Sequence, residues 1–211
     1  MHPNVFLRSF WQLELRPEVF VAMTFSDEYR ARFDEVIAPA IRSVQVGGVS
    51  LEPRRVDESR SGDSILTEIA DGITHSQLVL ADVSTLGRDS KSGRPYRNGN
   101  VMYEVGIALA CRQPAEVLLI RDGQDRFLLD VSTIPHMTLD FTDAGAARVR
   151  LASELVSRLR ERDLVHDALR AQRAADRRAA RPPGSPRGVR HPVRLTIINQ
   201  RGAICPNDST R

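Results

Sequence analysis

Two carboxylates stand where the chain could carry out chemistry on a ligand. Asp82 lies at the end of the apolar run Leu78–Val83, and Glu104 follows Asn100 by four residues in a helix-like segment. Two carboxylates at one cleft can divide labour: one stays ionised as a nucleophile or cation stabiliser, and the other handles a proton or hydrogen-bonds a ribose. We predict Glu104 and Asp82 as the catalytic residues.

Glu104 also has a purely structural interpretation. The helix dipole favours a carboxylate in the first turn of a helix, and this explains most glutamates at such positions. A capping box, however, places the acid three residues after the cap, whereas Glu104 lies four residues after Asn100. The structural interpretation is weakened by this spacing and stays open.

Polar residues at two predicted helix starts could hold the rest of a ligand. A helix start presents free backbone N–H groups and the positive end of the dipole, which together bind phosphate. The alternative is that Ser-Gly before a helix is a plain cap. As substrate-binding residues we predict Ser61, Gly62, Ser64, Asn98, Asn100 and Tyr103. We expect no metal site, because the two cysteines lie far apart and lack metal-ligand spacing.

Strand-like and helix-like segments alternate along the chain and would position these residues. Apolar runs predict strands over residues 19–25, 49–56, 78–83, 116–121 and 136–141. Apolar residues at helical spacing follow each of the first three runs and the last one. We therefore predict an α/β fold, a flavodoxin-like three-layer sandwich whose five-stranded parallel sheet has the order 2-1-3-4-5 with helices on both faces. Such sheets bind ligands at the carboxyl ends of their strands.

The basic residues are concentrated in the last part of the chain. The formal net charge is +3, yet residues 1–150 hold 17 basic and 21 acidic residues, whereas residues 151–211 hold 13 and 6. We divide the chain into an N-terminal extension (1–17), an α/β domain (18–168) and an Arg- and Pro-rich, flexible tail (169–211).

The tail leaves two questions open. Its arginines could form a nucleic-acid arm, but no aromatic residue interleaves them after Leu151, so nucleic acid is not the partner we expect. The segment Val193–Ile198 has strand character: it could dock on a sheet edge, pair between subunits or be adventitious.

Cysteine content and hydropathy indicate the compartment. Only 2 cysteines occur, which fits a reducing cytoplasm. The longest apolar runs are far shorter than the roughly 20 residues of a membrane span, and residues 1–16 lack the pattern of a secretory signal. We expect a cytoplasmic protein without a membrane partner.

An ordered series of motifs resembles a known superfamily. The motifs are Val-Phe-Val-Ala-Met-Thr-Phe (19–25), Ser-Gly-Asp-Ser-Ile (61–65), Leu-Val-Leu-Ala-Asp-Val-Ser (78–84) and above all Asn-Gly-Asn-Val-Met-Tyr-Glu-Val-Gly-Ile-Ala (98–108). Together they resemble the nucleoside 2-deoxyribosyltransferase-like and bacterial TIR-like families over about residues 18–160.

The resemblance implies cleavage or transfer at the N-glycosidic bond of a nucleoside, nucleotide or NAD. Glu104 matches the family's glutamate that attacks the anomeric carbon or stabilises its oxocarbenium-like charge. Asp82 matches an aspartate that contacts the sugar or helps the leaving group. No cofactor is implied, because NAD would be a substrate, and a homo-oligomer is expected.

Departures from the family pattern leave the activity open. Gly99 replaces a common proline, and Leu109 stands where relatives often carry a histidine. The loop 84–97 is longer than usual, and its basic residues could form a cationic lid or a solvated insertion. The main hypothesis is an N-glycosidase, NAD nucleosidase or deoxyribosyltransferase-like enzyme. The alternative is a non-catalytic, nucleotide-sensing TIR-like signalling module, for example in phage defense.

Overall fold

The structure is a computed structural model that describes residues 14–56, 62–123, 134 and 136–179, without the side chains of residues 62–64 and 179. The chain separates into two compact units, Met1–Leu169 and Arg170–Arg211. The first unit contains the sheet. The described part of the second is the last stretch of a helix, whose residues 170–178 are all exposed.

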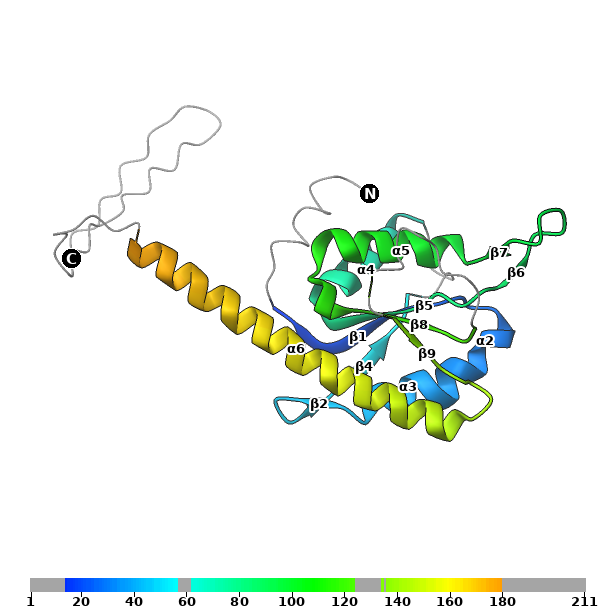
Figure 1. Ribbon diagram of the computed structural model, residues 1–211, viewed down its shortest axis with the longest axis horizontal. Coiled ribbons are helices and arrows are strands. Elements are labelled where there is room, and N and C mark those ends of the chain that lie inside the picture. The colour runs from blue at the N-terminus through cyan, green and yellow to red at the C-terminus, as the bar shows by residue number, and fades with distance from the viewer. Residues whose placement is uncertain (1–13, 57–61, 124–133, 135, 180–211) are drawn as a thin grey trace, which may run out of the picture. The chain divides into compact units, whose positions relative to one another are not determined.

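Five parallel strands form the central sheet (Figure 1). They run in the order β4-β1-β5-β8-β9, which is 2-1-3-4-5 when these five are counted along the chain, so the predicted topology is confirmed. Their bounds are β1 Arg16–Ala22, β4 Glu52–Arg54, β5 Ser76–Asp82, β8 Val117–Arg121 and β9 His136–Thr138. Every residue of the central strand β5 is buried, as expected for a parallel strand covered on both faces.

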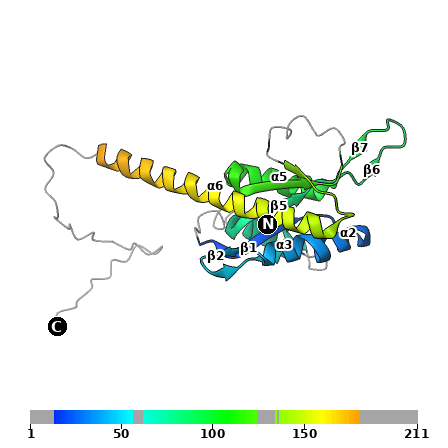
Figure 2. The ribbon, with the colours of Figure 1, turned by 60° about the horizontal axis from the view of Figure 1, so that its bottom comes forward.

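Helices cover both faces of the sheet, and the alternation of side chains along β1 shows why. Val19 and Val21 belong to one core cluster, whereas Phe20 and Ala22 belong to the other. Helix α3 and the first part of α6 pack on the first face, and α4 and α5 pack on the second (Figures 1 and 2). The helices are α2 Asp27–Ala31, α3 Ala38–Arg42, α4 Gly62–His75, α5 Gly99–Cys111 and α6 Ala144–Ala179.

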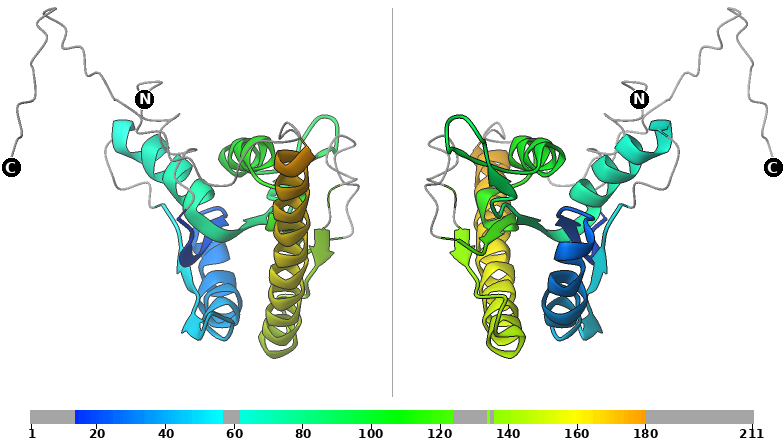
Figure 3. Two further views of the ribbon diagram at one scale, coloured as in Figure 1. Left: turned by 90° about the vertical axis from the view of Figure 1, so that its left-hand side faces the viewer. Right: turned by 90° about the vertical axis from the view of Figure 1, so that its right-hand side faces the viewer.

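The helical segment after β1 is irregular where Pro39 predicts a kink. Between α2 and α3 the chain forms a π-helix, η1 (Arg32–Ile37), immediately before the turn that holds Pro39. Proline has no N–H to donate to the preceding turn, and π-helical turns are a known accommodation within helices. Figure 3 shows α3 and α4 on opposite sides of β1.

Three element boundaries differ from the sequence-based expectation. The predicted strand 49–56 is divided into β3 (Val49–Ser50), which forms a hairpin with the preceding β2 (Gln45–Val46), and β4, which joins the sheet. Gly47 and Gly48 both have positive φ in the two-residue turn of the hairpin, as such turns require. Strand β9 is shorter than predicted. Helix α6 runs to Ala179 and so continues into the predicted tail, which begins at residue 169.

The long loop after β5 folds into a hairpin rather than a cover for the sheet. Strands β6 (Gly87–Arg88) and β7 (Pro95–Tyr96) pair antiparallel, and the Asp89 carboxylate accepts hydrogen bonds from residues 91 and 92 in its turn. Residues 88–94 are exposed, and the hairpin projects away from the sheet (Figures 1 and 2). This arrangement fits the solvated insertion better than the cationic lid.

We expect Gly72→Ala to destabilise the protein by about 1–3 kcal/mol. A Cβ at Gly72 in α4 would lie 2.7 Å from Cε2 of the Phe20 ring, and Phe20 is 1% exposed, so the ring cannot move aside. In an open helical position the same change stabilises by up to about 1 kcal/mol.

Gly106→Ala in α5 is the matched control, because no atom lies within 4 Å of a Cβ placed there. Urea unfolding of both variants should give changes of opposite sign. If Gly72→Ala were as stable as Gly106→Ala, the tight contact between α4 and β1 would be wrong.

Candidate functional site

The strand order reverses between β1 and β5: the chain passes from β1 to β4 on one side and then to β5 on the other. Open α/β sheets bind ligands at the carboxyl ends of the strands at such a point. Strands β1 and β5 are neighbours, with Ala22 opposite Ala81. The helical segment after β1 packs on one face of the sheet, and α5, which follows β5, packs on the other. Asp82 and the start of α5 therefore lie at the same edge of the sheet.

Asp82 is held in a polar cluster at this edge. Its carboxylate accepts hydrogen bonds from the backbone N–H of Ser84, at 3.0 Å, and from the Ser84 hydroxyl. Arg32 of η1 reaches the same carboxylate at 3.5 Å and donates to the Ser84 hydroxyl at 3.0 Å. Its other terminal nitrogen pairs with Asp122, which follows β8. The cluster thus connects η1 with the ends of two neighbouring strands.

Arg32 is fixed by aromatic rings as well as by carboxylates. Its guanidinium lies 4.2 Å from the Tyr29 ring centroid and 4.6 Å from that of Phe141. Contacts of this kind stabilise a cation and restrict its motion. The guanidinium is therefore a positioned positive charge between Asp82 and Asp122.

Burial raises the pKa of the Asp82 carboxyl above its ordinary value, since the residue is only 6% exposed. Hydrogen bonds from Ser84 and the charge of Arg32 act in the opposite direction. A buried carboxyl of raised pKa beside a fixed cation is suited to hold a proton or to accept a ligand's hydroxyl.

We expect the stability of Asp82→Asn relative to the wild type to increase as the pH rises. Because the folded-state pKa is raised above 3.8, the folded chain holds this proton more tightly than the unfolded chain. The wild type has that contribution in full below the unfolded-state value and loses it as the pH rises through the folded-state value. Urea unfolding of both proteins at several pH values measures the difference.

Asp140→Asn is a control of opposite sign. Hydrogen bonds from Thr142 lower the pKa of the exposed Asp140 carboxyl. The stability of the wild type relative to Asp140→Asn should therefore increase as the pH rises. The same sign for both variants would contradict the raised pKa of Asp82.

The start of α5 presents the other predicted residues in distinct roles. The Asn98 side chain caps the helix, because its Oδ1 accepts from the N–H groups of Asn100 and Val101 at 2.9 and 3.3 Å. Asn100 is exposed, and Tyr103 is 58% exposed. Glu104 is half-buried on the second turn, beside the buried Val105. Asn98 therefore has a structural role whatever else it contacts.

The predicted phosphate site at the start of α4 is only partly within the described residues. Ser61 lies outside them. Gly62 is the first residue of α4, so a helix does begin where the sequence predicts one. The backbone of Ser64 is helical, and nothing is described of its side chain.

A hollow of about 470 Å³ opens beside the ends of β1 and β4. In it, the Arg55 guanidinium lies between the rings of Phe25 and Phe33, 4.3 Å from each centroid. The predicted site residues that the structure describes do not line this hollow. Its lining comes from the loop after β1, the following helical segment and β4: Thr24, Phe25, Ser26, Arg30, Phe33, Asp34, Arg42, Pro53 and Arg55.

Sequence reasoning found Asp82 and missed most of its surroundings. Arg32 and Asp122 lie 50 and 40 positions away from Asp82 along the chain. The one sequence signal for Asp122 is its place directly after the strand-like run 116–121. Arg54, at the end of β4, pairs with Glu18 and Asp71.

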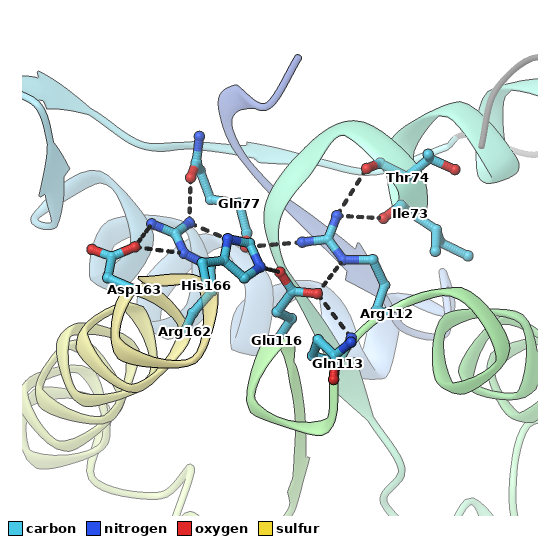
Figure 4. A network of polar contacts seen from close by, with 9 residues as sticks. All are labelled: Ile73, Thr74, Gln77, Arg112, Gln113, Glu116, Arg162, Asp163 and His166. Atoms are coloured by element: carbon cyan, nitrogen blue, oxygen red, sulfur yellow. Dashed lines mark hydrogen bonds and ion pairs between the residues drawn. The ribbon is translucent and has the colours of Figure 1, made fainter. Parts of the chain in front are cut away.

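A second polar network lies at the amino ends of β5 and β8, at the end of the sheet opposite to Asp82 (Figure 4). Arg112 donates to the carbonyls of Ile73 and Thr74 and pairs with Glu116 at 3.0 Å. His166 of α6 reaches Glu116 from the other side, also at 3.0 Å. Because the network joins helix ends and lies away from the carboxyl ends of the strands, we assign it to stability rather than to ligand binding.

Comparison with known proteins leaves the function to be argued from geometry. No family model matches the chain, and no curated protein matches it. In the part of the chain that the structure describes, no group of three or more His, Cys, Asp or Glu side chains could hold a metal ion. No helix among these residues is long and apolar enough to cross a membrane.

Proposed function

We propose that the protein cleaves or transfers at the N-glycosidic bond of a nucleotide, either NAD or a nucleoside 5′-phosphate. One observation carries the proposal. The buried Asp82 ends the central strand beside the point where the strand order reverses, and the helix that carries Glu104 begins at the same carboxyl end of the sheet. The motif resemblance between residues 18 and 160 supports the same chemistry.

In the proposed reaction, Glu104 is the carboxylate that meets the anomeric carbon. The bond from this carbon to the base nitrogen breaks, and the electron pair leaves with the base. Glu104 either bonds to the carbon or stabilises its positive charge, and water or an acceptor nucleobase completes the reaction. Asp82 accepts a hydrogen bond from the sugar or assists the departing base.

The anionic part of the nucleotide would lie in the hollow beside β1 and β4. Three arginines line this hollow, Arg30, Arg42 and Arg55, and guanidinium groups bind phosphate oxygens in bidentate pairs. Arg55 is pre-oriented by the two phenylalanine rings, which reduces the entropy lost on binding.

Product analysis tests the proposal. The full chain is incubated with NAD and with a panel of ribo- and deoxyribonucleoside 5′-phosphates, at low and high protein concentration, and released base or nicotinamide is separated by chromatography. Release of base from at least one member of the panel is expected. No release from any of them at either concentration would sink the proposal.

A second candidate function is nucleotide sensing without turnover, as in a TIR-like signalling module. It is favoured by the engagement of Asp82 with Ser84 and Arg32 and by the use of Asn98 as a helix cap. Asp82 and Asn98 then hold the loop after β5 and the start of α5 in place and take no part in catalysis. Calorimetry that detects binding of a nucleotide which the protein leaves intact would support this candidate.

A further inference from the structure

The two edges of the sheet differ in how well they resist pairing with another strand. Edge strand β4 carries Pro53 between Glu52 and Arg54, and both proline and charge block strand addition. Edge strand β9 is His136–Met137–Thr138, with neither proline nor Asp, Glu, Lys or Arg. In the described part of the chain, β9 pairs with β8 alone.

The hydrogen-bonding groups of β9 are oriented for a further partner. The N–H of Leu139 donates to the Arg121 carbonyl of β8 at 2.8 Å. N–H directions alternate along a strand, so Met137 also faces β8, whereas the N–H of Thr138 points to the outer side. The side chains of Met137 and Leu139 lie on the α6 face of the sheet.

An apolar groove of about 690 Å³ runs beside this edge, between β9 and the first turns of α6. Met137, Ala146 and Val149 contribute to its lining. Val149 is 72% exposed, which is unusual for a valine beside a core. A strand added to β9 would place alternate side chains on this groove.

We propose that the β9 edge and its groove bind residues 193–198 of a second copy of this chain. This segment, Val-Arg-Leu-Thr-Ile-Ile, alternates so that Val193, Leu195 and Ile197 share one face. That face matches the apolar groove, and the backbone of the segment supplies the carbonyl that the Thr138 N–H lacks among the described residues.

The length of the chain between groove and segment favours a second copy over the same copy. Helix α6 continues for thirty residues beyond Val149, to Ala179, about 45 Å of helix. For the segment to reach the groove of its own copy, the thirteen residues 180–192 would have to span that distance, and an unstructured chain of that length spans about 20 Å on average. It reaches about 45 Å only when almost fully extended, so the local concentration of the segment at its own groove is very low.

An exchange between two copies closes the assembly, because each copy gives one segment and accepts one. Such reciprocal contacts produce a two-fold dimer rather than a fibre. The proposal does not depend on the chemistry assigned to Asp82 and Glu104, and it holds whether or not the protein is an enzyme.

The experiment measures the mass of the full chain by light scattering over a range of concentrations. The wild type should dimerise, and Thr138→Pro, Val149→Asp and Leu195→Asp should each weaken the dimer at least about tenfold. Thr138→Pro removes an outward N–H and leaves the pairing with β8 intact. Leu164→Asp, at a 71% exposed leucine on the same helix outside the groove, should dimerise like the wild type.

Mixing two variants gives a stricter test. Val149→Asp retains the unchanged segment 193–198, and Leu195→Asp retains the unchanged groove. The segment of the first variant can therefore bind the groove of the second, and the mixture should form a heterodimer although each variant alone is monomeric. A monomeric wild type at all concentrations, or a dimer that Val149→Asp and Leu195→Asp leave unchanged, would overturn the proposal. Circular dichroism spectra like that of the wild type confirm that the variants are folded.

Discussion

Glu104→Gln is expected to lower the rate of base release by about 10²–10³-fold, the loss typical of removing one group that stabilises charge in a transition state. The amide has the same shape but carries no charge, so it neither bonds readily to the anomeric carbon nor stabilises a positive charge on it. The half-buried position of Glu104 on α5 strengthens the effect, because electrostatic interactions are weakly screened away from water.

Steady-state kinetics on the best substrate of the panel measures this loss. A group that acts mainly in the transition state lowers kcat and kcat/KM together and leaves KM nearly unchanged. Glu68→Gln on α4 is the matched control, since Glu68 is also a half-buried helical glutamate and lies on another helix. Equal activity in wild type and Glu104→Gln would remove Glu104 from the chemistry, whatever the substrate.

The parallel sheet could be predicted from the sequence because strand-like and helix-like segments alternate and because burial on both faces leaves a strong signal in the central strand. Leu78–Ala81 is uninterrupted by polar residues, and all of β5 is buried. The same signal is weak at the edges of the sheet. Strand β4 has only three residues, one of them Pro53, and the chain before it forms a separate hairpin.

The last part of α6 overlaps the predicted flexible tail, and the overlap has a physical reason. Residues 169–179 have few large apolar side chains, which is why the sequence favours a tail there. Alanine, arginine and glutamine are nevertheless among the strongest helix formers, and they dominate this stretch. Burial and helix propensity are separate properties, and only the first was low.

The candidate site was predictable only where its residues end strands or begin helices. Asp82 and Asn98 satisfy that condition. Arg32 lies in mid-helix and meets Asp82 across 50 positions, and no local pattern predicts such a contact. The position of Arg55 between Phe25 and Phe33 likewise depends on the packing of β4 beside β1.

In the polar network of Arg112 and Glu116, Glu116→Leu is expected to destabilise the protein by about 3–5 kcal/mol. The side chains of Arg112 and Glu116 are 5% and 6% exposed and pair at 3.0 Å (Figure 4). Leucine would leave the buried guanidinium without its counter-charge. It would also remove the acceptor for the Gln113 N–H, at 2.9 Å.

An ion pair whose carboxylate is exposed provides the control. Glu161, whose side chain is 56% exposed, lies 3.4 Å from Arg158, and Glu161→Leu should change stability by about 1 kcal/mol or less. Urea unfolding of both variants measures the contrast. Similar small changes in the two would contradict the buried pairing of Glu116.

The double variant Arg112→Met/Glu116→Leu separates the charge from the other contacts. Removing both charges relieves the unpaired guanidinium, so the double variant should be destabilised by less than the sum of the two single variants, with a coupling energy of up to about 3 kcal/mol. It should still be less stable than the wild type, because Arg112 also satisfies the carbonyls of Ile73, Thr74 and Gln77, and methionine cannot donate to them. Strict additivity of the single effects would mean that the two side chains do not pair in solution.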